Sequence, residues 1–136
     1  MARASIALAA LLCCALADAR TVRVKGRVWD LETYVAAVVA GEAGIFSEAE
    51  ALKAMAIVVR TFAVTNLGRH KPEGFDLCEG PHCQRFLERG VTARIQAAVE
   101  ATEAELLWWQ GHSAQVFYTG HCGGRTENAR TLWPTI

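Results

Sequence analysis

The segment "LETYVAAVVAGEAG", residues 31–44, decides how the first half of this chain folds. Asp30 precedes it and is a good helix N-cap, and Gly41 and Gly44 indicate that such a helix ends here. Glu42 falls on the same stripe as the apolar side chains, so the pattern places one carboxylate on the buried face. The apolar members of this stripe have the spacing of an amphipathic helix: Leu31, Tyr34, Val35, Val38 and Val39.

Two segments on either side of this helix have equally clear patterns. Residues 21–28, "TVRVKGRV", alternate valines with basic residues and predict a half-buried strand with one basic face. Residues 47–50, "SEAE", have the form of a capping box, so we expect a second helix from about Glu48 to Leu67, stopped by Gly68. The middle of this second helix is almost entirely apolar, which predicts the central helix of the core.

The second half of the chain mixes helix and strand. Residues 68–91 contain two prolines and four glycines and predict a loop. Residues 92–105 predict a third helix, and residues 106–109 and 114–119 predict two strands around the turn 110–113. One side of the third helix is formed by Ile95, Ala98, Val99 and Thr102 and is expected to face the core. This order of elements predicts an α+β domain with a helical core and small β elements.

Length and charge limit the class of protein. The chain has 136 residues, which is enough for one domain with its own core. Its 14 Lys and Arg residues balance its 14 Asp and Glu residues, and they form no basic block. Because nucleic acid binding needs clustered cations that face the phosphates, nucleic acid is not expected as a partner.

Residues 1–19, "MARASIALAALLCCALADA", have the pattern of a secretory signal peptide. An early arginine precedes an apolar stretch that is too short for a stable membrane span, and small-x-small cleavage signals follow. Lys53 and Arg60 interrupt the apolar region 51–64, so we expect no membrane span after signal removal. The mature domain, residues 20–136, is expected to be secreted or periplasmic.

Three cysteines remain after signal removal, and an odd number excludes a complete set of internal disulfides. Cys78, His82 and Cys83 lie close together in "LCEGPHCQ", and thiolate and imidazole are good zinc ligands. A structural zinc site needs a fourth ligand, and His70 lies upstream in the same loop, while His121 and Cys122 in the Gly-rich segment are the other candidates. A Cys78–Cys83 disulfide and a Cys83–Cys122 disulfide are the alternatives, so zinc and disulfide both remain open.

Four blocks of this sequence together resemble the SpoIID/LytB family of bacterial cell-wall proteins. The resemblance extends from about Val28 to Trp133, and the order of the motifs is preserved. The family includes sporulation lytic transglycosylases, which cut peptidoglycan glycan strands, and relatives described as amidase enhancers. The blocks are "LETYVAAVVAGEAG" (31–44), "EALKAMAIVVRTFAV" (50–64), "GFDLCEGPHCQ" (74–84) and "AVEATEAELLWWQGHSAQVFYTGHCGGRTENARTLW" (98–133).

The resemblance implies a catalytic role for Glu42, which corresponds to the acid that ends the first helix in the family. A glycosidic oxygen is a poor leaving group and needs a proton donor, and apolar surroundings that disfavour a charged carboxylate suit that task. Hydrolases normally pair the acid with a second carboxylate. A lytic transglycosylase works with one, because the same Glu then takes a proton from the sugar's own 6-hydroxyl, which closes to a 1,6-anhydro end. This chemistry requires no cofactor.

The resemblance also implies ligands and partners. Zinc bound by the cysteine loop is a feature of some relatives, which supports a structural zinc here. The expected partners are peptidoglycan glycan strands and an amidase, which places the protein at the cell wall. Gln84 follows the cysteine in the family pattern, and Arg125, Thr126 and Glu127 follow two glycines that permit close approach of a ligand. These four residues are the expected substrate contacts.

Two features depart from the family pattern. Many relatives have Met-Pro after the catalytic Glu, where this chain has Ala43 and Gly44. The family domain also usually continues beyond the position of residue 136, so the domain is expected to be incomplete at its C-terminus. The alternative function is a non-catalytic wall protein that binds glycan or stimulates an amidase.

Three bulky side chains have open interpretations. Trp108 and Trp109 point to opposite faces of a strand, where a tryptophan either stacks on a sugar ring or packs in a core or interface. Arg60 is expected to bind a loop carbonyl or to pair with a buried acid. If that acid were Glu42, the ion pair would oppose its role as a proton donor.

Overall fold

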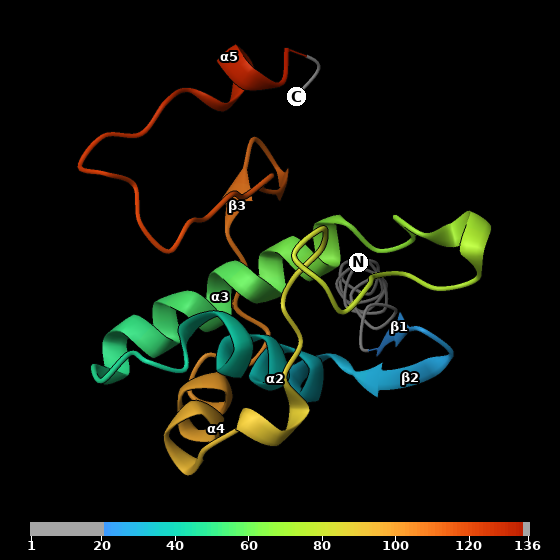
Figure 1. The fold of residues 1–136 in the computed structure, drawn as a ribbon, viewed down its shortest axis with the longest axis vertical. Helices are drawn as coiled ribbons and strands as arrows, with labels where there is room; N and C mark the ends of the chain where they lie inside the picture. The colour runs from blue at the N-terminus through green and yellow to red at the C-terminus, as the bar shows by residue number, and fades with distance from the viewer. Residues whose placement is uncertain (1–20, 135–136) are drawn as a thin grey trace, which may run out of the picture.

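The computed structural model describes residues 21–134, and the expected signal peptide lies outside this range. Helices α2, α3 and α4 pack together and form the body of the protein, with a two-stranded hairpin at one end (Figure 1). This is the α+β domain that the sequence predicts. The elements in chain order are β1 (Thr21–Val24), β2 (Arg27–Asp30), α2 (Leu31–Ala43), α3 (Ala49–Thr65), the 3-10 turns η2 (Lys71–Glu73) and η3 (Glu88–Gly90), α4 (Ala93–Glu100), β3 (Trp108–Trp109), β4 (His112–Ser113) and α5 (Ala129–Leu132).

Helix α2 is the centre of the core. Asp30 caps it as predicted, because its Oδ2 accepts a hydrogen bond from the backbone N–H of Thr33 at 3.0 Å. The helix contacts β2, α3, α4 and η3, so its alanines are buried together with its large apolar side chains. The buried surface of α2 is therefore wider than the single apolar stripe that the sequence predicts. The helix is enclosed on most sides, and its small residues let the neighbouring elements pack closely.

Helix α3 begins and ends close to the predicted positions, although its ends form in a different way. The expected capping box is absent, because Ser47 Oγ donates to the adjacent Glu48 carboxylate at 3.2 Å. The helix ends two residues earlier than predicted. There Asn66 donates to the carbonyl of Phe62 from both its backbone N–H (3.0 Å) and its side-chain Nδ2 (2.9 Å), which closes the last turn.

Helix α4 is shorter than the predicted helix 92–105. Thr92 Oγ1 caps its start by accepting from the backbone N–H of Ile95. Near its end, Thr102 Oγ1 donates to the carbonyls of Ala98 (2.9 Å) and Val99 (3.3 Å), and residues 101–104 form turns instead of helix. The predicted buried face is confirmed, because Ile95, Ala98, Val99 and Thr102 are all buried.

The predicted single strand at residues 21–28 is wrong, because the chain reverses in its middle. Lys25 (φ +40°) and Gly26 (φ +83°) both have left-handed backbone conformations and form a two-residue hairpin turn. Val22 therefore faces Trp29 across the antiparallel pair, and both are buried. Val28, expected on the buried face, is 66% exposed because the turn changes the face to which it points.

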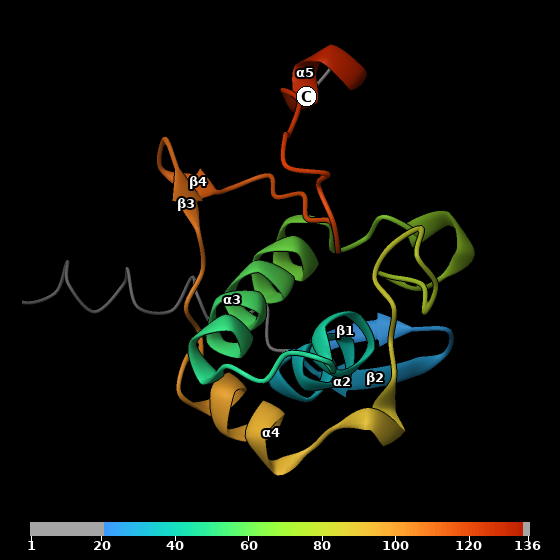
Figure 2. The same ribbon diagram turned by 60° about the vertical axis from the view of Figure 1, so that its left-hand side comes forward.

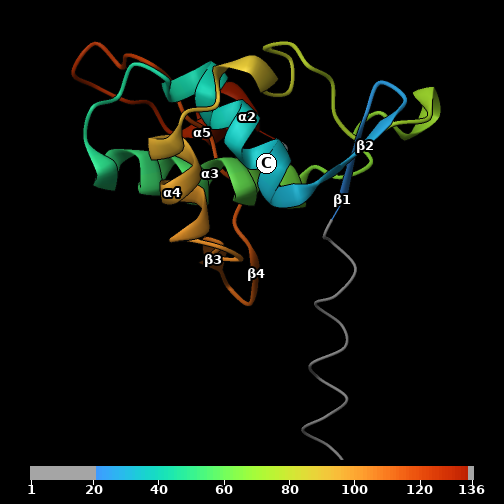
Figure 3. The ribbon, with the colours of Figure 1, turned by 90° about the horizontal axis from the view of Figure 1, so that it is seen from below.

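The second hairpin is also shifted from its predicted register. Strands β3 and β4 are joined by Gln110 (φ +49°) and Gly111 (φ +85°), so His112 and Ser113 lie in a strand and residues 114–119 do not. Figure 2 shows this hairpin and α5 standing away from the helical body. Figure 3 shows the two hairpins on different sides of the helices. None of the helices in residues 21–134 has both the length and the apolar composition needed to cross a bilayer.

Candidate active site and metal cluster

Glu42 is the last residue but one of α2 and is half-buried. Its Oε1 accepts a hydrogen bond of 2.7 Å from the backbone N–H of Arg85. That bond joins the end of α2 to a segment 43 residues further along the chain and fixes the direction of the carboxylate. The other carboxylate oxygen accepts no hydrogen bond from the residues that the structure describes.

Residues 83–87, which we call the Gln84 loop, lie directly on α2. The backbone N–H of Leu87 donates to the carbonyl of Ala37 at 3.0 Å, one helical turn before Gly41. A Cβ atom on Gly41 would lie only 2.1 Å from the carbonyl oxygen of Arg85. Gly41 was expected to mark the end of the helix, but the helix continues through it. Its function in the structure is to let the Gln84 loop reach Glu42.

Gln84 is completely buried and links three parts of the protein. Tyr34 Oη donates to Gln84 Oε1 at 3.1 Å, and Gln84 Nε2 donates to Tyr118 Oη at 3.1 Å and to the Val59 carbonyl at 3.4 Å. In this arrangement Gln84 presents no surface to a sugar. Its predicted contact with substrate stays a prediction, and the structure gives it the role of holding the loop in place.

The two tyrosines next to Gln84 were not identified as site residues from the sequence. Burial raises the pKa of Tyr34 well above its usual value. Burial also raises the pKa of Tyr118 to about 12, with a smaller increase from the negative charge of Glu42. Both phenols are therefore protonated near neutral pH. Tyr118 accepts its hydrogen bond from Gln84, which leaves its own hydroxyl hydrogen available for a ligand.

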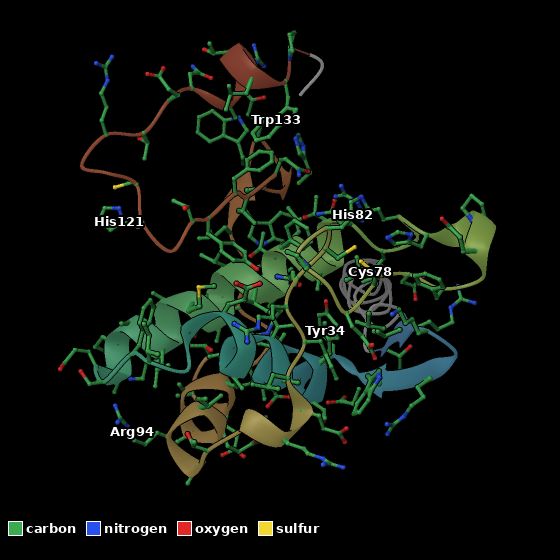
Figure 4. All side chains as sticks on the ribbon, viewed as in Figure 1. Tyr34, Cys78, His82, Arg94, His121 and Trp133 are labelled. Atoms are coloured by element: carbon green, nitrogen blue, oxygen red, sulfur yellow. The ribbon has the colours of Figure 1, made fainter. Side chains whose placement is uncertain are left out.

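A cluster of four metal-ligand side chains lies next to the Gln84 loop. The ligand atoms of His70, Cys78, His82 and Cys83 all lie within 4.8 Å of one another, and these are the four residues that the sequence predicts for zinc. Figure 4 shows Cys78 and His82 close together, with His121 on the far side of the molecule. Within residues 21–134, no other group of three or more His, Cys, Asp or Glu side chains comes together in this way.

Three of the distances between these ligand atoms are close to those expected around a tetrahedral zinc ion. Ligand atoms bound at about 2.1–2.3 Å to one zinc ion are separated from each other by roughly 3.6 Å. Cys83 Sγ lies 3.3 Å from His70 Nε2 and 3.8 Å from His82 Nδ1, and Cys78 Sγ lies 3.8 Å from the same His82 atom. Cys78, Cys83 and Cys122 are all unpaired, so neither alternative disulfide is formed in the structure. Burial raises the pKa of the Cys83 thiol.

Arg60 is fully buried but does not approach Glu42 as a partner. Its Nη2 lies 2.6 Å and its Nε 2.8 Å from the carboxylate of Glu32. Nη2 also donates to the carbonyl of Val99, and Nη1 donates to the carbonyl of Glu105. Arg60 therefore binds a loop carbonyl, that of Glu105, and also pairs with an acid, although that acid, Glu32, is only partly buried, with its side chain 24% exposed. No salt bridge joins Glu42 to a cation within the described part of the chain.

The structure does not bring the other expected substrate contacts to Glu42. Arg125, Thr126 and Glu127 are exposed in the C-terminal segment, residues 108–134, which stands away from α2 (Figures 1 and 2). Within it, Arg125 Nη2 lies 3.8 Å from Glu127 Oε1. Their contact with substrate stays a prediction. Trp108 and Trp109 are 57% and 66% exposed, so neither is a core residue.

Comparison with known sequences places this site in a described family. The family model SpoIID, Stage II sporulation protein, matches residues 5–109. The matched range contains Glu42, the Gln84 loop and the whole metal cluster. A search of curated proteins found no matching relative.

Proposed function

This chain belongs to the SpoIID family, whose role concerns the cell wall, and we propose that it cleaves peptidoglycan glycan strands as a lytic transglycosylase. Glu42 is the general acid and base. One observation carries this assignment: Glu42 is a carboxylate fixed at the end of a buried helix by the N–H of Arg85, while the buried cation Arg60 is paired with Glu32 at the other end of the helix. This arrangement needs no second acid.

The reaction proceeds with one proton moving to and from Glu42. The N–H of Arg85 binds Oε1, so the proton is carried on Oε2 and is transferred to the glycosidic oxygen as its bond to the anomeric carbon breaks. The 6-hydroxyl oxygen of the same sugar then bonds to that carbon, and its proton passes to the Glu42 carboxylate. Glu42 ends protonated, as it began, and the product has a 1,6-anhydro end with no water consumed.

Tyr118 supplies a hydrogen-bond donor close enough to Glu42 for the negative charge of Glu42 to raise the pKa of Tyr118. Because Gln84 Nε2 already occupies a lone pair of Tyr118 Oη, the hydroxyl hydrogen points elsewhere and is available for a sugar oxygen. The pKa of about 12 keeps this donor protonated across the physiological range. Tyr34 and Gln84 hold Tyr118 in position.

A structural zinc ion held by His70, Cys78, His82 and Cys83 is the second part of the proposal. Two thiols and two imidazoles are a common tetrahedral set for structural zinc, and the distances between these ligand atoms fit that geometry. When bound, zinc would join residue 70 to the Cys78–Cys83 turn. Cys83 directly precedes Gln84, so this link would hold the loop that orients Glu42.

Export by the signal peptide at residues 1–19 would bring the enzyme to its substrate at the cell wall. Peptidoglycan lies outside the cytoplasm, so the proposed reaction requires a secreted or periplasmic protein. An amidase remains a second expected partner.

The decisive test incubates purified glycan strands with the wild type and with Glu42→Gln, and identifies the products by mass spectrometry. We expect 1,6-anhydro ends from the wild type and a loss of roughly 10²–10⁴-fold in the variant. Glu103→Gln, which changes an exposed Glu away from the site, is the control and should retain activity. Water-terminated sugars would show hydrolysis instead, and no product from folded wild type would favour the non-catalytic glycan binder.

The proposed zinc site is tested separately, by measuring the zinc content of the protein and counting its free thiols. One zinc per chain is expected in the wild type and in Cys122→Ser, but not in Cys83→Ser. A metal-free protein with a Cys78–Cys83 disulfide, found by peptide mapping under non-reducing conditions, would contradict the zinc site and leave the role of Glu42 unaffected.

A further inference from the structure

A cavity lies between the β3–β4 hairpin and residues 115–130. The cavity has a volume of about 620 Å³. It is lined by the aromatic side chains of Trp108, Trp109 and Phe117 and by the polar side chains of Gln115, Asn128 and Arg130. We call these six residues the aromatic pocket. They take no part in the proton transfers at Glu42.

The aromatic side chains of this pocket are unusually exposed. Phe117 is 47% exposed in addition to the two tryptophans, and its ring stacks on Trp133 with centroids 5.0 Å apart and planes at 9°. Trp133 is itself 48% exposed, and Figure 4 shows it above the helical body in the C-terminal segment. A concentration of exposed aromatic surface around a cavity is typical of a binding site, whereas single exposed apolar residues are normal on any surface.

The chemistry of the lining suits a carbohydrate. Flat indole rings pack against the apolar C–H faces of pyranose rings, and the amide and guanidinium groups of Gln115, Asn128 and Arg130 can bind hydroxyl and acetamido groups at the edges of the sugar. The pocket has no Lys and only one Arg, so it lacks the clustered cations that a phosphate-rich ligand needs.

We infer that the aromatic pocket is a glycan-binding subsite that holds the strand away from the cleavage point, an inference that rests on the proposed function. The segment 114–119 connects the two sites. Phe117 lines the pocket, while the next residue, Tyr118, points inward and accepts a hydrogen bond from Gln84. Gln84 precedes Arg85, whose N–H binds Glu42. A strand in the pocket thus contacts the same short segment that completes the site around Glu42.

The pocket is also attached to the body on its other side. Thr65, at the end of α3, lines the cavity, and its Oγ1 donates to Ser113 Oγ at 3.1 Å and to the Ala114 carbonyl at 3.4 Å. The hairpin that carries both tryptophans is therefore held against α3 by direct hydrogen bonds. This attachment gives the subsite a fixed position relative to the body.

Binding is measured in the Glu42→Gln background, so that cleavage does not consume the ligand. The probe is soluble, peptide-free glycan strands, and tryptophan fluorescence or calorimetry gives the dissociation constant. We expect Trp108→Ala and Trp109→Ala each to weaken binding by roughly tenfold, about 1.4 kcal/mol. Trp109→Phe, which keeps an aromatic face, should weaken it less. Val28→Ala, an exposed apolar residue on the other hairpin, is the control and should not change the affinity.

The outcomes separate this inference from the proposed function. Tryptophan-dependent binding without cleavage by the wild type would support the subsite and reject the transglycosylase. Suppose instead that the wild type cleaves glycan, while both Ala variants bind it with unchanged affinity and have the circular dichroism spectrum of a folded protein. That result would overturn the subsite and leave the proposed function standing. Equal binding of dextran, which lacks acetamido groups, would overturn the proposed specificity. Sedimentation could also show that the protein forms concentration-dependent dimers, and that the Ala variants abolish these dimers without changing the glycan affinity. The aromatic surface would then serve self-association, which would also overturn the inference.

Discussion

The body of the protein, residues 21–107, contains a buried apolar core, whereas its C-terminal segment, residues 108–134, does not. Every buried residue that the structure describes lies in the body, from Val22 to Thr102. In the C-terminal segment, five large apolar side chains are each more than 40% exposed: Trp108, Trp109, Phe117, Leu132 and Trp133. The difference shows that apolar composition alone does not place a residue in the core.

Regular helices explain why the body buries its apolar groups. Helices α2, α3 and α4 repeat their apolar residues at helical spacing and pack on one another, so each helix supplies the surface that the others cover. The C-terminal segment has only two-residue strands and one short helix, which cannot form such a face. We therefore expect stability to depend on the body, while ligand contacts extend into the segment.

Among these predictions, Arg60→Met, a change in the body, is expected to lower the free energy of unfolding the most. Arg60 is fully buried against Glu32 and two carbonyls, so its removal leaves a carboxylate without its partner and should lower the free energy of unfolding by about 3–5 kcal/mol. Chemical denaturation measures this change. Lys53→Met, which breaks the exposed pair with Glu50, is the control and should cost less than about 1 kcal/mol. Equal costs for the two variants would show that burial does not set the strength of these pairs.

An intermediate effect is expected from Gly41→Ala. The added methyl would overlap the carbonyl of Arg85, so the backbone of Arg85 must move away. That movement breaks the hydrogen bond from the N–H of Arg85 to Glu42. We expect a loss of about 1–3 kcal/mol in stability, together with a fall in glycan cleavage. Gly80→Ala is a matched control, because a Cβ there meets nothing within 4 Å and the backbone is not left-handed. Wild-type cleavage by Gly41→Ala would show that the Gln84 loop does not position Glu42.

The smallest effect is expected from Tyr118→Phe, which tests the connection between body and segment. The change removes one hydrogen bond to Gln84 and should lower the free energy of unfolding by about 1 kcal/mol. Limited proteolysis should then cut residues 114–134 faster, with cuts in the body unchanged. Phe117→Leu, which alters the neighbouring side chain without touching Gln84, serves for comparison. Uniformly faster cutting throughout the chain would mean that Tyr118 supports the whole fold and not the connection.

Much of the candidate site could be predicted from the sequence because its signals are local. The apolar repeat of one helix places Glu42 on the buried stripe, while its catalytic role is implied by the family resemblance, and Cys78, His82 and Cys83 lie within six residues of one another. His70 lies eight residues before Cys78, close enough for one loop to bring it to the same place. The buried role of Gln84 gave no such signal, because a polar residue in a loop is usually exposed.

By itself the sequence determined the three main helices, the Asp30 cap, the buried face of α4 and the position of Glu42 at the end of α2. These depend on spacing and capping within a few residues, which the chain carries wherever it folds. Only the tertiary structure decided that Glu32 pairs with Arg60, that Gly41 admits the Gln84 loop, and that Tyr118 reaches Gln84. Those contacts join residues 28 to 44 positions apart, and they depend on how loops and turns route the chain, which no local pattern specifies.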